Sequence, residues 1–184
     1  MFKRMFENLF VIPTRQIMLT EIEVLSFTAI EKVLQYYRDI DASNLQKAVL
    51  RYFSKQAIYQ RNTQTYQGLH PQEGSIRTFY ENGRGLVGEH TISRILIPQK
   101  KDLVTFNNQL LAEALPPLPT LKANQIPVLA YGQYIGTQTL NGQSNPVNVL
   151  FTDYHVIAPN QNNTVPSRYS FIYKTNQPNT LAKV

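Results

Sequence analysis

Residues 43–61, Ser-Asn-Leu-Gln-Lys-Ala-Val-Leu-Arg-Tyr-Phe-Ser-Lys-Gln-Ala-Ile-Tyr-Gln-Arg, contain the change of hydrophobic period that decides the fold class. In the first half, apolar residues recur at steps of three and four, which predicts a helix that begins at Ser43 with a capping box completed by Gln46. The apolar stripe of this helix consists of Leu45, Ala48, Val49, Tyr52 and Phe53. After Lys55 the period becomes two, which predicts a strand over about 57–62.

Helices are predicted before this point of the chain and mostly strands after it. Residues 26–41 carry a helical stripe with Ser26 as the N-cap, and a third, short helix begins near Ile76 and stops at Gly83. Four more strands are predicted at about 89–97, 126–138, 147–157 and 167–175. Asn141-Gly142 is a strong hairpin signal between the second and third of these strands.

The stretch 107–125 interrupts the strands and is predicted to be a long connection, with one helical turn at 107–114. It contains Pro116, Pro117 and Pro119. Connections of this length inside a compact domain are often functional.

The order of elements predicts an α+β domain in which a strongly curved, mostly antiparallel sheet wraps over three N-terminal helices. Parallel α/β folds need strands and helices in regular alternation, which this sequence lacks. The predicted organisation is an N-terminal arm at 1–22, one domain at 23–177 and a C-terminal tail at 178–184.

The arm contains phenylalanines that are costly to leave in water, namely Phe2, Phe6 and Phe10. We expect it to dock on the domain. The alternative is a helix lying on a membrane surface, because Lys3 and Arg4 stand beside the phenylalanine series.

The composition excludes several classes of site. The 184 residues include no cysteine, which rules out disulfides, thiolate metal sites and thiol catalysis. The three histidines show no metal-binding spacing, so no metal is expected. No glycine-rich phosphate motif occurs, so no nucleotide cofactor is expected.

Charge and hydropathy exclude two kinds of partner. The formal net charge is +6, but the basic residues are spread singly except at Lys3–Arg4 and Lys100–Lys101, so nucleic-acid binding is not predicted. No apolar stretch reaches the length of a membrane span. We expect a cytoplasmic protein.

The strand at 147–157 carries polar residues on one face. Alternation places Phe151, Asp153 and His155 on one side of the sheet. A charged residue on that side is typical of a polar pocket rather than a dry core. Three roles remain open for Asp153: an ion pair with Arg61, acid–base chemistry, or neither.

Five segments resemble the nuclear-transport-factor-2-like superfamily, which includes ketosteroid isomerases and SnoaL-like polyketide cyclases. They are Tyr36-Tyr-Arg-Asp-Ile-Asp-Ala-Ser-Asn44, Tyr52-Phe-Ser-Lys-Gln-Ala-Ile-Tyr59, Ile76-Arg-Thr-Phe-Tyr80, Gly88-Glu-His-Thr-Ile92 and Val149-Leu-Phe-Thr-Asp-Tyr-His155. The resemblance covers about 26–175. It implies a cone-shaped α+β roll of the cystatin-like type, with a pocket between sheet and helices.

The resemblance also implies roles for individual residues. Tyr36 resembles the oxyanion-binding tyrosine of the isomerases, and Asp153 resembles their neutral acid and the acid–base aspartate of the cyclases. Arg61 falls where the isomerases have a carboxylate base. Because arginine is protonated at neutral pH, isomerase chemistry on steroids is not expected.

These observations lead to two hypotheses. The first is a domain that binds a hydrophobic small molecule, with catalytic candidates Asp153 and Tyr36 and activity of the lyase, isomerase or cyclase type. Its expected ligand-binding residues are Tyr36, Tyr59, Arg61, His90, Phe151, Asp153 and His155. The second is a non-catalytic interaction module. In either case we expect a homodimer, formed through a partly apolar outer face of the sheet.

Overall fold

The computed structural model describes residues 21–42, 45–82, 86–140, 142–159, 162 and 164–174. Its helices and strands are α1 (Glu21–Asp41), α2 (Leu45–Tyr52), β1 (Phe53–Arg61), β2 (Gln64–Gln67), α3 (Ile76–Asn82), β3 (Leu86–Leu96), α4 (Lys100–Ala112), β4 (Ile126–Leu140), β5 (Gln143–Ala158) and β6 (Thr164–Lys174). The predicted arm up to residue 20 and the tail at 178–184 lie outside the described residues.

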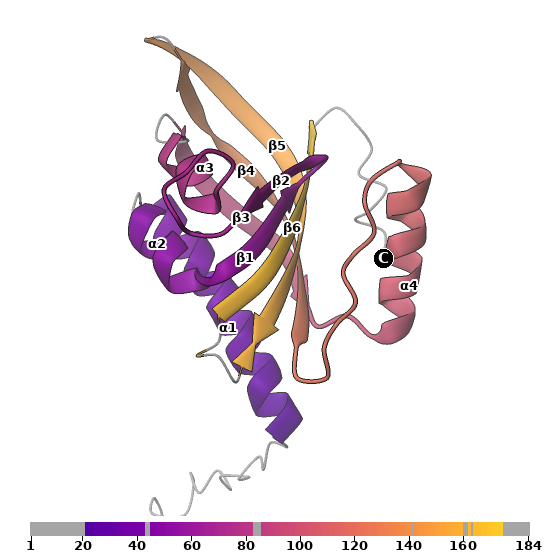
Figure 1. The fold of residues 1–184 in the computed structure, drawn as a ribbon. Coiled ribbons are helices and arrows are strands. Elements are labelled where there is room, and N and C mark those ends of the chain that lie inside the picture. The colour runs from indigo at the N-terminus through magenta and orange to yellow at the C-terminus, as the bar shows by residue number, and fades with distance from the viewer. Residues whose placement is uncertain are drawn as a thin grey trace, which may run out of the picture.

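The described strands form one curved sheet in the order β2-β1-β6-β5-β4-β3. Neighbouring strands are antiparallel except for β1 and β6, which are parallel. Helices α1, α2 and α3 cover one face of this sheet, which is the concave face, and α4 covers the other (Figure 1). The predicted α+β class, with a mostly antiparallel sheet over three N-terminal helices, is confirmed.

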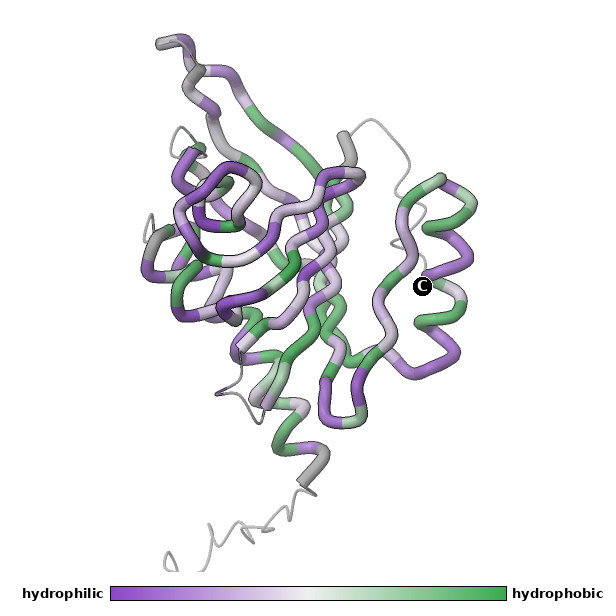
Figure 2. Tube along the Cα trace, in the orientation of Figure 1, coloured by the Kyte–Doolittle hydropathy of each residue, from purple (hydrophilic) through white to green (hydrophobic). Residues whose placement is uncertain are grey.

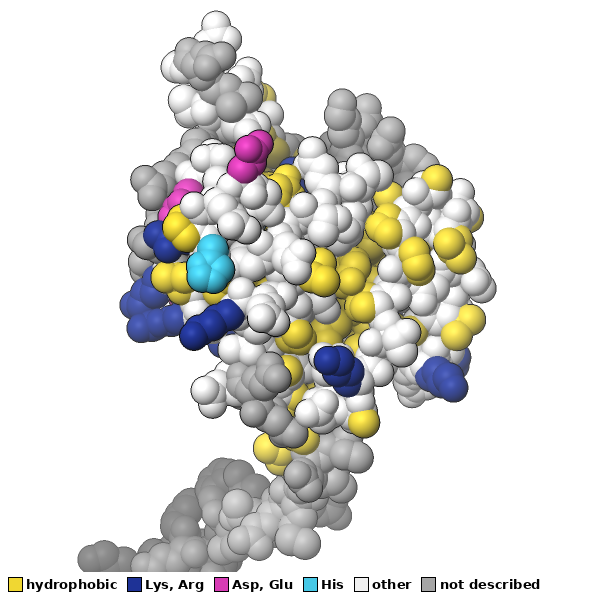
Figure 3. Space-filling view, in the orientation of Figure 1, with side chains coloured by type: hydrophobic (Ala, Val, Ile, Leu, Met, Phe, Trp, Pro, Cys, Tyr) yellow, Lys and Arg dark blue, Asp and Glu magenta, His cyan; other side chains and the backbone are white. Residues whose placement is uncertain are grey.

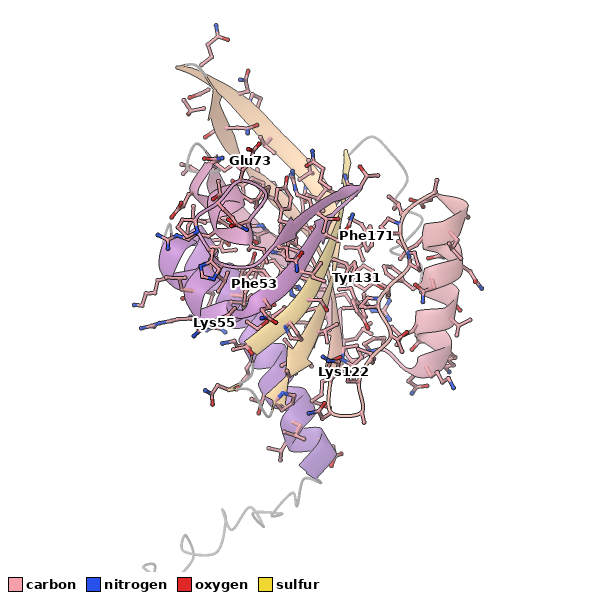
Figure 4. The ribbon with its side chains drawn as sticks, viewed as in Figure 1. Phe53, Lys55, Glu73, Lys122, Tyr131 and Phe171 are labelled. Carbon is pink, nitrogen blue, oxygen red and sulfur yellow. The ribbon has the colours of Figure 1, made fainter. Side chains whose placement is uncertain are left out.

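The helical period of the first half of the chain produces the layer on the concave face. Side chains of α1, α2 and β1 pack together there, among them Val33, Val49, Phe53 and Ala57. Helix α1 begins at Glu21 and runs through Ser26, so the predicted N-cap at Ser26 is wrong. Phe53, predicted as the last residue of the helical stripe, is the first residue of β1, and Figure 4 shows it on the helix side of the sheet.

The turn that contains Gly142 sets the register of the long β4–β5 hairpin. Leu140 pairs with Gln143, so the connection has two residues, and Gly142 has φ +78°. Such short turns require the left-handed conformation that glycine adopts without steric cost. The alternation predicted for β5 follows from this register.

Helix α4 is the main departure from the predicted fold. It begins at Lys100 and has 13 residues, where the sequence predicted one helical turn inside a connection. The side chain of Asp102 caps it by accepting a hydrogen bond from the backbone N–H of Gln99 at 2.9 Å. Leu103, Phe106 and Leu110 then recur at helical spacing, which was the signal that the prediction missed.

The second hydrophobic cluster of the molecule lies between α4 and the convex face of the sheet. Phe106 and Leu110 of α4 pack there with Leu118, and the strands contribute Leu129, Tyr131, Tyr154, Val156, Tyr169 and Phe171. Figure 4 shows Tyr131 and Phe171 between the strands and the helix, and Figure 2 shows hydrophobic residues recurring along α4. The chain therefore buries both faces of its sheet, which explains why β5 is buried without interruption from Phe151 to Ala158.

Candidate functional site

A cavity of about 580 Å³ opens between the concave face of the sheet and helices α1, α2 and α3. Its walls are mainly aliphatic and aromatic, with contributions from Ile40, Leu45, Phe79, Val147, Val149, Phe151 and Ile172. Leu86 and Val87 are both lining and exposed, so they lie at the mouth. Asp153 and Arg168 are almost fully buried and form part of the floor.

The register of three strands brings the floor residues together. Two rows cross the concave face from β1 through β6 to β5, and they consist of Tyr59, Arg168 and His155, and of Arg61, Ser170 and Asp153. Arg168 is therefore a diagonal neighbour of Asp153, whereas Arg61 is separated from Asp153 by the whole of β6.

The ion pair of the floor joins Asp153 to Arg168 and not to Arg61. Nη2 of Arg168 donates to Oδ2 of Asp153 at 2.5 Å. The predicted pair with Arg61 is wrong because two strand spacings, about 10 Å, lie between the two positions. Arg61 lines the same cavity, as predicted, and its guanidinium stands 5.6 Å from the ring centre of Phe79.

Tyrosines surround the guanidinium of Arg168. Nη1 donates to the hydroxyl of Tyr80 at 2.7 Å and to the hydroxyl of Tyr36, and these two hydroxyls are hydrogen-bonded to each other. The guanidinium also stands 4.7 Å from the ring centre of Tyr36 and 5.0 Å from that of Tyr59. Such contacts stabilise a cation that has been removed from water.

The charges of the floor follow from these contacts. Burial, the largest single cause, raises the pKa of Asp153, but the Arg168 guanidinium and the smaller causes, among them hydrogen bonds from Ser170 and Tyr37, together outweigh burial and hold the pKa below its ordinary value. Burial raises the pKa of Tyr36 well above its ordinary value. At neutral pH the floor consists of a charged pair surrounded by protonated tyrosines.

His155 lies behind the cavity and does not line it. Its Nδ1 is hydrogen-bonded to the hydroxyl of Tyr52, and its Nε2 lies 3.2 Å from the hydroxyl of Tyr37. Burial, followed by the charge of Arg168, lowers the pKa of His155 to about 3, so its imidazole is neutral. His155 was predicted to contact ligand directly, but the structure places it behind the cavity wall, where it contacts the hydroxyls of Tyr37 and Tyr52.

His90 reaches the cavity from β3 and is held by the end of α1. Its Nδ1 lies 2.6 Å from Oδ1 of Asp41, and its backbone N–H donates to Oδ2 of Asp41 at 2.9 Å. Both residues line the cavity. The two contacts orient the imidazole beside the ring of Tyr134, whose centre is 4.8 Å away.

The structure brings most of the predicted ligand-binding residues to one cavity. Those that line it are Tyr36, Tyr59, Arg61, His90, Phe151 and Asp153. Sequence reasoning missed Arg168, although a lone arginine on a strand otherwise rich in apolar and aromatic residues was a signal of the same kind as Asp153. The sequence pattern placed Tyr37, Tyr52 and Tyr80 on helix faces, but it did not predict that their hydroxyls contact polar groups of the sheet.

Within the described part of the chain, no group of three or more His, Asp or Glu residues is arranged to hold a metal ion. No helix among the described residues has the length and hydropathy needed to span a bilayer.

Comparisons with known proteins find similarity in structure only. No family model matches the sequence, and no curated protein matches it. A candidate SnoaL-like polyketide cyclase from Shewanella denitrificans superposes with a TM-score of 0.54 at 10% identity, over 79% of this chain and 90% of that one. A ketosteroid isomerase-like protein from Erwinia carotovora atroseptica gives 0.53 at 8% identity, over 87% of this chain and 100% of that one.

A third solved structure extends the range of these neighbours. The beta subunit of a candidate aromatic-ring-hydroxylating dioxygenase from Novosphingobium aromaticivorans gives a TM-score of 0.53 at 13% identity, over 87% of this chain and 96% of that one. At such identities the likeness concerns the fold. The chain has a cystatin-like α+β fold, which is the fold that the five sequence segments predicted.

Proposed function

We propose that this protein binds a hydrophobic small molecule with at least one aromatic ring in the cavity between its sheet and its helices. The observation that carries the proposal is the cavity itself, about 580 Å³ with mainly apolar walls and a few polar groups at its buried end. Binding sites for small molecules typically have this volume and this division between walls and polar groups. The names of the structural neighbours are consistent with a fold that holds organic ligands.

The pKa values of Asp153 and Tyr36 at the cavity floor agree better with ligand binding than with catalysis. A catalytic acid or base works best when its pKa lies near the working pH. Arg168 holds the pKa of Asp153 below its ordinary value, and burial raises that of Tyr36 well above its own. Asp153 is therefore a weak base, and it carries no proton that it could donate to an oxyanion. Activity of the lyase, isomerase or cyclase type would need another pair of groups.

A cavity-filling variant tests the proposal. Val149 lines the cavity from β5, so Val149→Trp should occupy its volume and abolish binding of 2-methoxynaphthalene, measured by isothermal titration calorimetry. Ile135→Trp is the matched control, because Ile135 is 54% exposed and lies outside the lining. Equal binding by the two variants, or no binding of naphthalene derivatives by the unmodified protein, would contradict the proposed function.

The homodimer remains a prediction, but the surface first expected to form it is occupied. Helix α4 covers the convex face of the central strands with Phe106 and Leu110. A dimer would have to form through surfaces that α4 leaves uncovered. Sedimentation equilibrium decides between the 21.1 kDa chain and twice that mass. The cytoplasmic location likewise remains a prediction.

A further inference from the structure

Arg61 brings a positive charge to the β1 side of the cavity. It is the last residue of β1, and it lines the cavity. Its side chain is only half-buried, so part of its surface is accessible. Among the described residues, its guanidinium has no ion pair and no side-chain hydrogen bond. Its N–H groups are therefore available to water or to a ligand.

An aromatic ring supports this guanidinium. The guanidinium carbon of Arg61 stands over the ring of Phe79, 5.6 Å from the ring centre. The ring of Phe79 packs in turn against Tyr66, with ring centres 4.4 Å apart, and against Tyr59, with ring centres 5.4 Å apart. The N–H groups of a guanidinium lie in its plane, so a contact over a ring face occupies none of them. Phe79 therefore supports the cation and leaves its hydrogen-bond donors unused.

The two carboxylates of the cavity lining have other partners. Asp153 pairs with Arg168, and β6 lies between Asp153 and Arg61 in the sheet. Asp41 accepts from the backbone N–H of His90 and contacts its imidazole. His90 belongs to β3, which is separated from β1 by β6, β5 and β4. Neither carboxylate therefore neutralises Arg61.

The lining of the cavity has one positive charge in excess. Lys47, Arg61 and Arg168 contribute three cations, and Asp41 and Asp153 contribute two carboxylates. One monovalent anion restores the balance, whereas a phosphate group, with a charge of about −2, would reverse it. A carboxylate is a monovalent anion whose two oxygens match two parallel N–H groups of a guanidinium.

We infer that the ligand of this cavity is an aromatic carboxylic acid, bound as its anion with the carboxylate on the guanidinium of Arg61. The aromatic part lies against the apolar wall that β5 forms with Val149 and Phe151. This inference rests on the proposed function and adds the charge of the ligand to it.

Arg77 of α3 shows what distinguishes Arg61 from an ordinary surface arginine. Both side chains are half-buried. Arg77 is paired with Glu81 at 2.8 Å and lies outside the cavity lining, so the protein itself neutralises its charge. Arg61 lines the cavity and has no such partner in the described part of the chain. Arg77 is therefore the matched control for Arg61.

The test compares two probes that differ by one charge. Isothermal titration calorimetry on the full chain at pH 7 would measure dissociation constants for 2-naphthoate and for 2-naphthamide, its neutral amide of almost the same shape. We expect 2-naphthoate to bind at least about tenfold more tightly, because hydrogen bonds between ionised partners are roughly twice as strong as those between neutral ones. This comparison needs no variant.

Two matched variants then locate the preference. Arg61→Gln removes the charge and keeps a polar side chain, so the two probes should then bind within about threefold of each other. Arg77→Gln changes the net charge by the same amount outside the cavity, and the preference should remain. Circular dichroism at the temperature of the titration checks that both variants are folded.

The outcomes separate the inference from the function on which it rests. Equal affinities for the two probes in the unmodified protein, or tighter binding of the amide, would overturn the inference and leave the proposed function standing. Binding of 2-methoxynaphthalene without binding of 2-naphthoate would do the same. Binding of none of the three compounds would overturn both.

The variants can also contradict the inference. A preference for 2-naphthoate that survives in folded Arg61→Gln would show that another group recognises the carboxylate. A preference that Arg77→Gln loses to the same extent would show that the net charge of the protein, and not a contact with Arg61, causes it.

Discussion

Arg168 balances the charge of the protein interior. It is 5% exposed, and it contacts the carboxylate of Asp153 and the hydroxyls of Tyr36 and Tyr80. A buried carboxylate and a buried guanidinium each lose several kcal/mol of hydration, which only close pairing and further hydrogen bonds offset. The tyrosine hydroxyls provide these hydrogen bonds, so the ion pair and the aromatic cluster depend on each other.

Arg168→Met should lower the free energy of unfolding by about 3–5 kcal/mol, because it leaves an ionised carboxylate buried without its partner. The double variant Asp153→Leu/Arg168→Met should recover most of that loss. Urea denaturation at pH 7 measures both. Arg77→Met removes half of a surface pair and should change stability by no more than about 1 kcal/mol. A loss below about 1 kcal/mol for Arg168→Met would show that water reaches Asp153.

His155 should make the protein less stable as the pH falls below neutrality. Its pKa in the folded chain is about 3, against an ordinary value of 6.5, so the unfolded chain binds the proton first. Its contribution to the free energy of unfolding is complete above about pH 6.5. That contribution declines by about 1.4 kcal/mol per pH unit between pH 6.5 and pH 3. Asp153, whose pKa is lowered in the folded chain, stabilises the protein fully above its ordinary pKa of 3.8 and loses this contribution only below that value, outside most of this range.

The measurement is the difference in stability between pH 7 and pH 5. The unmodified protein should lose about 2 kcal/mol more than His155→Gln, which retains a hydrogen-bonding side chain and does not titrate. Taking the difference between the two proteins cancels the other titrating groups. Equal losses would mean that His155 is protonated in the folded protein.

At the scale of elements, Gly132 sets the approach of β3 to β4 beside the cavity. It pairs with Ile92, where the register of the two strands shifts. A Cβ atom at this position would meet the carbonyl oxygen of Thr91 and would lie 2.6 Å from Cζ of Phe151. Glycine is therefore required by the closeness of its neighbours and not by its backbone angles.

Gly132→Ala should destabilise the protein by about 1–3 kcal/mol, since either β3 must move away or the ring of Phe151 must shift into the cavity. Thermal denaturation measures the loss, and weaker binding of 2-methoxynaphthalene reports the shift of the ring. Gln133→Ala on the same strand removes one exposed hydrogen bond to Asn148 and should cost less than about 1 kcal/mol. If both substitutions cost the same, the contact is not a tight one.

At the scale of the whole molecule, α4 converts a two-layer fold into three layers. Figure 3 shows hydrophobic side chains along the boundary between the sheet and the α4 layer. The side chain of Asn107 accepts a hydrogen bond from the backbone N–H of Leu118 at 2.7 Å, which fixes the returning segment against the helix. The helix covers a face that would otherwise be an apolar patch open to association.

Phe106→Ser should detach α4, lower the free energy of unfolding by about 3–5 kcal/mol and cause self-association that increases with concentration. Sedimentation velocity over a range of concentrations measures the association. Leu111→Ser is the matched control on the same helix, because Leu111 is 60% exposed and its replacement should leave sedimentation unchanged. If Phe106→Ser sediments like the unmodified protein, α4 does not protect this face.

Local patterns were enough for most elements. The change of period after Lys55, the hairpin signal at Asn141-Gly142 and the alternation along β5 depend only on residues close in sequence, so they predicted helices, turn and strand faces correctly. The sequence predicted only one turn of helix α4, although its apolar residues recur at helical spacing, because the prolines that follow the helix favour a connection.

Two properties could not be obtained from the sequence. The first is the partner of Asp153: Arg61 and Arg168 are equally good cations, and only the insertion of β6 between β1 and β5 places one beside the carboxylate and the other two strands away. The second is the depth at which each polar group is buried. His155 lies behind the cavity wall, whereas the Tyr80 hydroxyl lies at the cavity floor beside Arg168. Sequence by itself determined the periodicities and therefore the fold class, because periodicity is a local property of the chain. Only the tertiary structure decided the ion partner of Asp153 and the depth of each polar group, because these depend on which distant strands become neighbours.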